Sequence, residues 1–358
     1  GPGLGAGRGG VLRGGGSGPE VGSAAVEVLT AACEGCGLEL DVRHGPDPTA
    51  PGAGLSEAAA EFCRRTFAAG GAVLTGPHGG RWVYELRQRF DLFCKVSPIV
   101  ASRELARAVL PPAPREVDLL VVREQAAGIY QGRWSETDRR RDGHVAEHSF
   151  SYSSLEVRRI AEVSAALASV RGGRLSVVVK RAGIPSISSL WIEVAEEVAS
   201  RAGVACEVLD IDYAVYALLR DPDRFDVLVA PNLFGDVLAD AGGVLLGSRG
   251  LCFGASFDDG AAAVYQTNHG SAHDLAGLDR ANPGAQVLAA AALLRESFGQ
   301  ERAASAIERS LRAVWAEGHR TEDLAEDGAT IVGTAELGAR VVERVAQRAT
   351  WEAGASPR

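Results

Sequence analysis

No apolar run in this 358-residue chain approaches the length needed to cross a membrane, and its start lacks the charged-then-apolar order of a secretion signal. Long basic runs are missing as well. The densest cluster, Arg139 to Arg141, lies between Asp138 and Asp142, and the net charge is -9. These absences predict a cytoplasmic protein with neither a membrane nor a nucleic-acid partner.

Cysteine is also scarce. The six cysteines include one C-x-x-C pair, Cys33 and Cys36, with no second pair and no histidine nearby, so we expect reduced structural thiols rather than a metal site. Apolar residues at 46% and charged residues at 23% are ordinary for a globular chain, and the length suits one or two domains. Residues 1 to about 9 are rich in glycine and are expected to be disordered.

Short apolar runs alternate with helical apolar patterns along the whole chain. Strands are predicted at residues 11–12, 72–74, 119–122, 175–179 and 225–230. This alternation predicts an α/β fold with a largely parallel or mixed sheet. Gly14 and Gly16 resemble the start of a dinucleotide fingerprint, but its third glycine falls on Pro19, so a Rossmann domain is not expected.

Two carboxylates follow the predicted strand 225–230. Gly235 is interpreted as a turn and Asp236 as the start of a helix, so Asp236 and Asp240 project from one helical face. Such hard oxygen ligands suit Mg²⁺ or Mn²⁺ and leave positions open for substrate oxygens. The spacing alone fits a solvated helix start, favoured by the helix dipole, better than a metal site.

Six further segments occur in order at compatible spacings: Gly16-Ser-Gly-Pro-Glu-Val21, Leu119-Leu-Val-Val-Arg-Glu124, Gly128-Ile-Tyr130, Glu156-Val-Arg-Arg-Ile160, His269-Gly-Ser-Ala-His-Asp-Leu-Ala-Gly277 and Gly333-Thr-Ala-Glu336. With the Asp236 segment, they resemble the β-decarboxylating dehydrogenases, such as isopropylmalate, isocitrate, tartrate and D-malate dehydrogenases. The resemblance covers nearly the whole chain, and its pattern is nearest to 3-isopropylmalate dehydrogenase.

The resemblance implies a two-domain, isopropylmalate-dehydrogenase-like fold in which helices flank a mixed sheet. Residues 1–104 and 247–358 are expected to form the cofactor-binding domain. Residues 105–246 are expected to form the substrate, metal and dimerisation domain, with an arm near 136–152 that is exchanged across a homodimer. Family members oxidise a 2-hydroxy acid that carries a further carboxylate, pass a hydride to a nicotinamide and release CO₂.

Metal and substrate residues follow from the same resemblance. Asp236 and Asp240 match the ligands of a divalent cation, and Asp212 matches the carboxylate lent by the neighbouring subunit. Arg87 and Arg123 match two of three arginines that bind the carboxylates of a small anionic substrate.

The third arginine position holds Ser97, so either Arg107 or Lys95 substitutes or the substrate differs. Tyr84 occupies a specificity position together with Gly80 and Val83, and would narrow an aliphatic pocket.

The residues predicted to act as acid and base match the family less closely than the metal and substrate residues do. Tyr152 matches the family tyrosine, although without the resemblance such a residue is more often half-buried packing of the arm. Arg181 stands where the family has a lysine, and arginine is a poor proton acceptor. Lys180 is the alternative, but neighbouring strand residues face opposite sides. Gly183 replaces an asparagine.

The nucleotide segment begins at His269. Small residues at Gly270, Ser271 and Ala272 let the backbone approach NAD, and Asp274 matches the acid that accepts hydrogen bonds from the adenosine ribose. A carboxylate there repels a 2′-phosphate, which favours NAD over NADP. Asn282 matches an adenine-side contact, and His273 replaces the usual proline.

Two functions remain open. The first is NAD- and metal-dependent oxidation, with decarboxylation, of a 2-hydroxy acid other than isopropylmalate. The second is a catalytically weak paralogue that acts as a nucleotide-binding, regulatory or structural subunit, because Ser97, Arg181 and Gly183 depart from the family. Retention of all three metal carboxylates favours the enzyme. The substrate and the choice between dimer and tetramer are not predicted.

Overall fold

The computed structural model describes residues 7–50, 54–105, 117–135, 138–140 and 143–354. Its centre is a ten-stranded sheet in the order β11-β10-β12-β5-β4-β13-β14-β3-β1-β2. The strands, in chain order, are β1 (Gly7–Leu12), β2 (Leu40–His44), β3 (Ala72–Thr75), β4 (Cys94–Val100), β5 (Asp118–Glu124), β10 (Arg174–Val179), β11 (Ala205–Asp210), β12 (Val227–Ala230), β13 (Phe253–Phe257) and β14 (Ala263–Thr267).

The sheet is mixed, as the sequence predicts. β4 pairs antiparallel with both β5 and β13, and β13 pairs antiparallel with β14, whereas the remaining pairs are parallel. The helices are α1 (Gly18–Cys36), α2 (Glu57–Ala68), α3 (Trp82–Arg89), α4 (Ser154–Ser169), α5 (Pro185–Ala202), α6 (Ile211–Arg220), α7 (Asn232–Leu246), α8 (Gly284–Ala292), α9 (Glu301–Ala316) and α10 (Thr334–Gly354).

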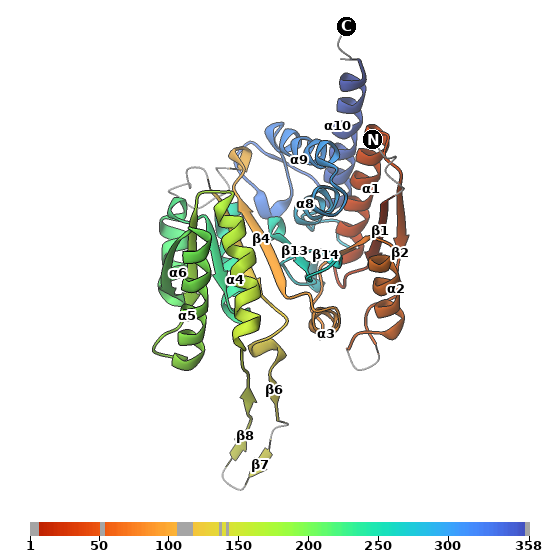
Figure 1. The fold of residues 1–358 in the computed structure, drawn as a ribbon. Coiled ribbons are helices and arrows are strands. Elements are labelled where there is room, and N and C mark those ends of the chain that lie inside the picture. Colours follow the sequence, from red (N-terminus) through yellow and green to blue (C-terminus); the bar gives the residue numbers. More distant parts are fainter. Residues whose placement is uncertain (1–6, 51–53, 106–116, 136–137, 141–142, 355–358) are drawn as a thin grey trace.

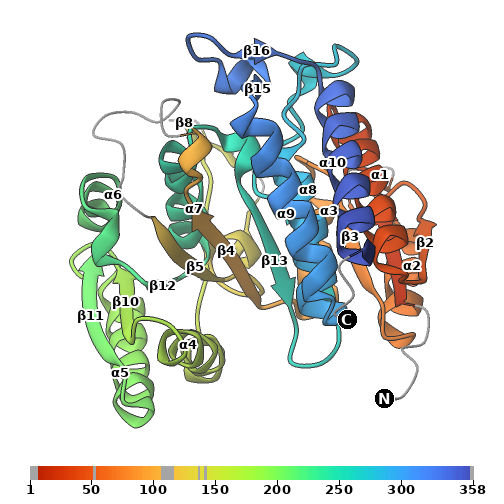
Figure 2. The ribbon, with the colours of Figure 1, turned by 90° about the horizontal axis from the view of Figure 1, so that it is seen from above.

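Helices cover both faces of this sheet. One face carries a continuous core built from the sheet with α1 and α6 to α10. The other face carries two separate clusters, one under α4 and α5 and one under α2 and α3. Accordingly, α4 and α7 lie on opposite sides of β5 and β12 in Figure 2. The apolar residues of the strands are therefore buried on both sides, which explains their nearly continuous apolar sequences.

Local signals set the ends of several helices. Pro19 lies in the first turn of α1, and Gly37 ends that helix in the left-handed conformation. Ser153 and Glu156 form a capping box at the start of α4. Gly247, at a φ of 89°, ends α7 after the metal-acid segment.

The predicted domain division corresponds to a division of the strands. β5, β10, β11 and β12 occupy one end of the sheet, while the other six strands, which come from residues before 101 and after 252, occupy the rest. Because one sheet runs through both groups, two separate domains stay a prediction. The arm, with the short strands β6 (Arg133–Trp134), β7 (Asp138–Arg140), β8 (Gly143–Val145) and β9 (His148–Ser149), protrudes from the body (Figure 1).

Two sequence-based boundaries are wrong. Residues 7–9 belong to β1, where they pair with β2 and β3, so the strand begins four residues before Val11. The α7 helix begins at Asn232 rather than at Asp236, so Gly235 is a helical residue and not a turn. Residues 1–6 lie outside the described part of the chain.

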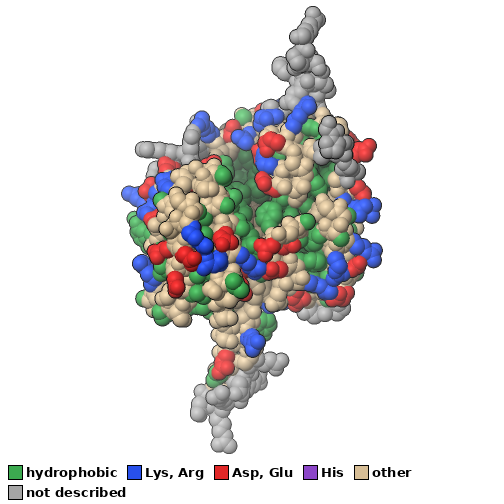
Figure 3. Space-filling model, viewed as in Figure 1, with side chains coloured by type: hydrophobic (Ala, Val, Ile, Leu, Met, Phe, Trp, Pro, Cys, Tyr) green, Lys and Arg blue, Asp and Glu red, His purple; other side chains and the backbone are tan. Residues whose placement is uncertain are grey.

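The six cysteines, all of which the structure describes, form no disulfide. Within the described residues, no helix combines the length and the apolarity that crossing a bilayer requires. On the face shown in Figure 3, acidic and basic side chains are interspersed around a hollow between the two sides of the molecule.

Close packing of α7 on the sheet yields a test. A Cβ atom at Gly242 would lie 2.2 Å from Cδ1 of the buried Ile99 on β4, so Gly242→Ala should lower the free energy of unfolding by about 1–3 kcal/mol. At Gly22, in α1, an added Cβ meets nothing within 4 Å, and Gly22→Ala should raise the free energy of unfolding by up to about 1 kcal/mol. Urea unfolding of both variants measures this contrast; equal stabilities would contradict the packing of α7 against β4.

Candidate active site

Asp236 and Asp240 lie one turn apart on α7, as their spacing predicts. Arg123 Nη1 donates a hydrogen bond to Oδ1 of Asp236, and the Tyr130 hydroxyl donates to Oδ2 at 3.1 Å. Burial raises the pKa of Asp236, but the cations of Arg123, Lys95 and Arg87 outweigh burial and hold the pKa below its usual range. Asp236 is therefore an anion at neutral pH.

Asp240 has a different partner. Arg249, which follows α7, donates from Nη2 to Asp240 Oδ2 at 2.7 Å. Both acids therefore offer oxygen atoms beside arginines, and hard oxygen donors of this kind fit Mg²⁺ or Mn²⁺. Among the described residues of one chain, no group of three or more histidine, cysteine, aspartate or glutamate side chains could hold an ion. Asp212, the third ligand that the resemblance implies, is bonded to Lys180 in this chain.

Arg123 is fixed at the end of β5 by several contacts. Its Nε and Nη2 donate to Asn232 Oδ1 at 3.1 and 2.7 Å, and Asn232 Nδ2 donates to the Ala127 carbonyl at 2.6 Å. A Cβ atom at Gly235 would lie 2.6 Å from Cβ of Arg123. Glycine at this position therefore lets α7 approach β5 closely enough for Arg123 to reach Asp236.

Arg87 and Lys95 extend the basic cluster around Arg123. Arg87 comes from α3 and Lys95 from β4, and both side chains are buried. Lys95 lies directly opposite Arg123 in the antiparallel pair of β4 and β5. The structure thus brings together the two predicted substrate arginines, and it adds a lysine that the sequence offered only as one of two substitutes.

Ser97 takes part in packing within the sheet. Its hydroxyl is buried and accepts a hydrogen bond from Asn268 Nδ2 at 3.0 Å. Ser97 is therefore a neutral residue held within the sheet, and it adds no charge to the cluster. Arg107, the other proposed substitute for the missing arginine, lies outside the described residues.

Tyr84 forms an aromatic wall beside the cations. Its ring lies 5.3 Å from the guanidinium carbons of both Arg81 and Arg87, and it meets the ring of Tyr130 edge to face at 5.5 Å. Cation–π contacts on a ring favour one orientation of that ring. Tyr84 is therefore held next to Arg87, at the place where the sequence predicts a narrowed pocket.

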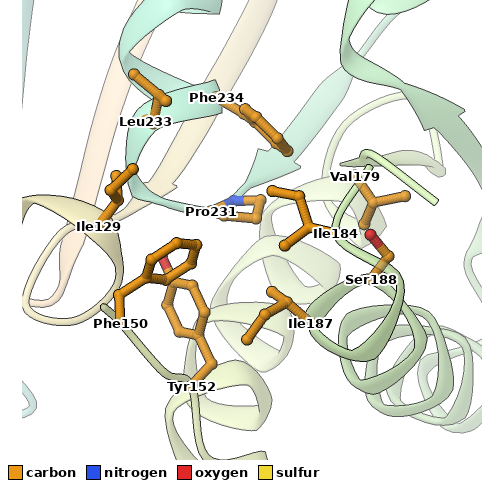
Figure 4. Close-up of a pocket in the computed structure, with 10 residues that line it drawn as sticks. All are labelled: Ile129, Phe150, Tyr152, Val179, Ile184, Ile187, Ser188, Pro231, Leu233 and Phe234. Carbon is orange, nitrogen blue, oxygen red and sulfur yellow. The ribbon is translucent and has the colours of Figure 1, made fainter. Parts of the chain in front are cut away.

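Tyr152 lies in the core rather than at the acids. Its hydroxyl accepts a hydrogen bond from the backbone N–H of Asn232 at 2.9 Å, and burial raises its pKa far above the usual range. Its ring lines the apolar pocket of Figure 4, between α5 and the start of α7. The other lining residues are Ile129, Phe150, Val179, Ile184, Ile187, Ser188, Pro231, Leu233 and Phe234. An acid–base role for Tyr152 stays a prediction, whereas Tyr130 is the tyrosine bonded to Asp236.

Lys180 and Arg181 follow β10 at the far end of the sheet. Lys180 Nζ donates to Asp212 Oδ1 at 2.5 Å, and Arg181 Nη2 donates to Asp210 Oδ2 at 3.2 Å. Both pairs are substantially exposed. No described contact joins them to Asp236 or Asp240 of the same chain, which fits residues that would act in a neighbouring subunit.

The predicted nucleotide loop packs on the turn between β1 and α1. Ser17 N and Ser17 Oγ donate to the Ser271 carbonyl at 2.8 and 3.2 Å. Gly16 has a φ of 57°, and a Cβ there would lie 2.1 Å from the Ser271 oxygen. At Gly270 an added Cβ would meet nothing within 4 Å, so the loop is open on that side. Two segments that both carry the resemblance thus lie in contact although they are distant along the chain.

The remaining loop residues differ in their contacts. His269 Nδ1 contacts the Gly270 carbonyl at 3.0 Å, Ala272 has a φ of 45°, and Asp274 is exposed in the short helix His273–Leu275. Asn282 is buried: its Nδ2 donates to Asp323 and its Oδ1 accepts from Gly284 N. Both polar atoms of that amide are therefore used within the protein, and the adenine contact of Asn282 stays a prediction.

Sequence reasoning missed three residues of the cluster: Tyr130, Asn232 and Gln266. For Tyr130 a signal was present, because it ends the Gly128-Ile-Tyr130 segment that carried part of the resemblance, only seven residues after Arg123. Asn232 immediately follows Pro231 at the start of α7. Gln266 gave no signal, since its place beside Lys95 depends on the order of β4, β13 and β14.

Comparisons with known proteins identify the family of the chain. The sequence model of the isocitrate/isopropylmalate dehydrogenase family matches residues 10–341, so the chain belongs to that family. It is 36% identical to the 3-isopropylmalate dehydrogenase of Nitratidesulfovibrio vulgaris over 356 residues, covering 94% of this chain and 98% of that protein. For the 3-isopropylmalate dehydrogenase of Geobacillus kaustophilus, the identity is 37% over 348 residues, covering 91% and 92%.

A solved structure shows the same fold. The isocitrate dehydrogenase of Methylococcus capsulatus superposes with a TM-score of 0.83 at 29% identity, covering 95% of this chain and all of that one. The predicted family, the mixed α/β fold and a hydroxy-acid dehydrogenase activity are thereby confirmed.

The two tyrosines allow a direct test of their different positions. Tyr152→Phe leaves the buried Asn232 N–H without an acceptor and should lower the free energy of unfolding by about 1–3 kcal/mol. Tyr130→Phe leaves Asp236 paired with Arg123 and should stay within about 1 kcal/mol of the parent. Chemical denaturation distinguishes the two; a stable Tyr152→Phe protein would argue against its structural role.

Proposed function

We propose that the protein catalyses the NAD- and divalent-cation-dependent oxidation, with decarboxylation, of a 2-hydroxy acid that carries a further carboxylate. The observation that carries this proposal is the juxtaposition of Asp236 and the buried cations Arg87, Lys95 and Arg123. Carboxylates suit a cation, and buried arginines suit substrate carboxylates. Only a ligand that is itself anionic and binds a metal uses both features.

Asp236 and Asp240 would hold the cation, with Asp212 supplied by a second copy of the chain. When bound, such a cation polarises the substrate hydroxyl and stabilises the negative charge left when CO₂ departs. Two changes must accompany its binding. Asp236 must exchange the Arg123 guanidinium for the cation, and Asp212 must loosen its bond to Lys180.

The chain's own residues would position the substrate and move a proton. A substrate carboxylate on Arg123 would compensate this arginine for the loss of Asp236. Burial raises the pKa of Tyr130 to about 12, so its hydroxyl is protonated at neutral pH and donates a hydrogen bond to Asp236. Tyr130 is therefore a second candidate, beside Tyr152, for the role of the family tyrosine. Of Lys180 and Arg181, only Lys180 is bonded to the acid lent to the partner.

A homodimer with shared sites is part of this proposal. Large apolar side chains are exposed on α6 at Tyr213, Tyr216 and Leu219, and on α7 at Val237 and Val244. These two helices pack on one another and carry Asp212 and Asp236, respectively. A second copy that covered this face would bring Asp212 and Lys180 of one chain toward α7 of the other. The protruding arm supplies further surface (Figure 1).

The substrate would be smaller than isopropylmalate. The ring of Tyr84, held between Arg81 and Arg87, stands where a branched aliphatic group would have to enter. The two relatives described above are named 3-isopropylmalate dehydrogenases, and a pocket narrowed by Tyr84 would give the present chain a different substrate. An unbranched 2-hydroxy dicarboxylate fits the remaining groups.

NADH formation with malate, tartrate, isocitrate and isopropylmalate, each with Mg²⁺ or Mn²⁺, tests the proposed function. We expect turnover of an unbranched dicarboxylate, with kcat/KM for isopropylmalate roughly 10- to 200-fold lower. Tyr84→Leu should narrow that difference by removing the ring. If isopropylmalate were the best substrate of the parent protein, the size argument would be refuted. If no acid yielded NADH, the nucleotide-binding or regulatory alternative would be favoured, which the departures from the family at Ser97 and Arg181 already suggest.

Cofactor preference depends on Asp274. Because this exposed carboxylate would meet the 2′-phosphate of NADP, we expect NAD to bind more tightly, and Asp274→Asn should reduce the difference between their dissociation constants. Fluorescence titration of NADH and NADPH measures both constants. Glu322→Gln, a change at an exposed acid paired with Arg280, serves as the control and should leave the preference unchanged. Tighter binding of NADPH by the parent would place the ribose elsewhere.

A further inference from the structure

Lysine is rare in this chain: of 37 basic side chains only Lys95 and Lys180 are lysines, and Lys95 is 4% exposed. Its neighbours in the sheet are Arg123 on β5 and Ser256 on β13, each directly opposite. Residues directly opposite in an antiparallel pair have side chains on the same face. Lys95 and Arg123 therefore bring two positive charges onto one buried patch.

The charges of this patch do not balance. Three cations, Arg87, Lys95 and Arg123, are buried, whereas Asp236 is the carboxylate bonded to one of them. In the described part of the chain, no carboxylate forms an ion pair with Arg87 or Lys95. With its amide oxygen turned toward them, Gln266 accepts from Arg87 Nη2 at 3.2 Å and from Lys95 Nζ at 3.1 Å. Two cations thus share one neutral acceptor.

Other polar atoms in the patch lack partners. Arg87 Nε and Ser256 Oγ are buried without a hydrogen bond among the described residues. Burial, Arg87 and Lys95 lower the pKa of His78 to about 3, so His78 is neutral and adds no charge. Asp240, the next acid on α7, is bonded to Arg249. Asp236 is thus the one carboxylate hydrogen-bonded to any of the three basic side chains of the patch in the described part of the chain.

Such an arrangement opposes folding in the absence of a ligand. Like charges directly opposite in a sheet are destabilising, and a buried ion without a counter-ion is costly. Burial, with the charges of Arg87 and Arg123, moves the pKa of Lys95 well below its usual value. An apolar side chain would pack here at lower cost, so the stability sacrificed at Lys95 calls for a ligand.

We propose that Lys95 binds a second carboxylate of the substrate and, with Arg87 and Arg123, makes the site selective for dianionic 2-hydroxy dicarboxylates over monoanions. This inference rests on the proposed function. It adds the residue that would bind the second carboxylate of the substrate. Ser97 lies two residues from Lys95 on the same face of β4, and its hydroxyl is occupied by Asn268. The cation that the family resemblance places at Ser97 has thus moved along the strand to Lys95.

Binding of an unreactive dianion tests the proposal without turnover. Malonate, titrated calorimetrically without NAD or metal, should bind the parent protein at least tenfold more tightly than acetate. In Lys95→Met, which keeps the length of the side chain, malonate should bind roughly 10- to 100-fold more weakly and approach acetate. The unliganded variant should melt at a higher temperature than the parent because a buried like charge is gone. Arg340→Met, at a helical surface pair, is the control and should change neither value.

The outcomes separate this inference from the proposed function. Malonate binding that is weak in the parent, unchanged in Lys95→Met, or lost only because the variant melts at a lower temperature would overturn the role of Lys95. If malonate binding requires Lys95 but no hydroxy acid yields NADH, the dianion site stands and the proposed reaction falls. If a hydroxy acid yields NADH but malonate binds Lys95→Met as tightly as the parent, the proposed reaction stands and the role of Lys95 falls.

Discussion

The ion pair between Arg123 and Asp236 is the contact on which the site depends. It joins the end of β5 to α7, and it exists because Gly235 allows the helix to lie against the strand. Asn232 holds the guanidinium from the same helix, and Tyr130 holds the carboxylate from the other side. The pair therefore sets the position of the proposed metal acid and of the substrate arginine at once.

Competition for these two charges links binding to chemistry. On the proposed function, a cation that bound Asp236 would displace Arg123, and a carboxylate that bound Arg123 would displace Asp236, so each ligand would facilitate the binding of the other. The surplus positive charge at Lys95 and Arg87 adds to the demand for an anion. A protein that keeps several basic side chains buried together gives up folding stability for ligand binding, which is common at active sites.

Sequence reasoning succeeded where a signal is local and failed where strands far apart must meet. The one-turn spacing of Asp236 and Asp240 and the glycine turn at Gly16 are local, and the structure has both. That Tyr130 bonds Asp236 while Tyr152 lies in the core depends on tertiary packing, and short motifs do not carry that information. The contact of Lys95 with Gln266 requires β4, β13 and β14 to be neighbours in an order that the sequence does not reveal.

The central claim is that Arg123 and a divalent cation compete for Asp236, and Mn²⁺ binding to Arg123→Gln tests it most directly. Without substrate, this variant should bind Mn²⁺ more tightly than the parent protein, because Asp236 is no longer paired, while it should bind malonate more weakly. Electron paramagnetic resonance of free Mn²⁺ measures the affinity. An affinity for Mn²⁺ that is unchanged or lower in Arg123→Gln would contradict the competition and remove Asp236 from the metal site.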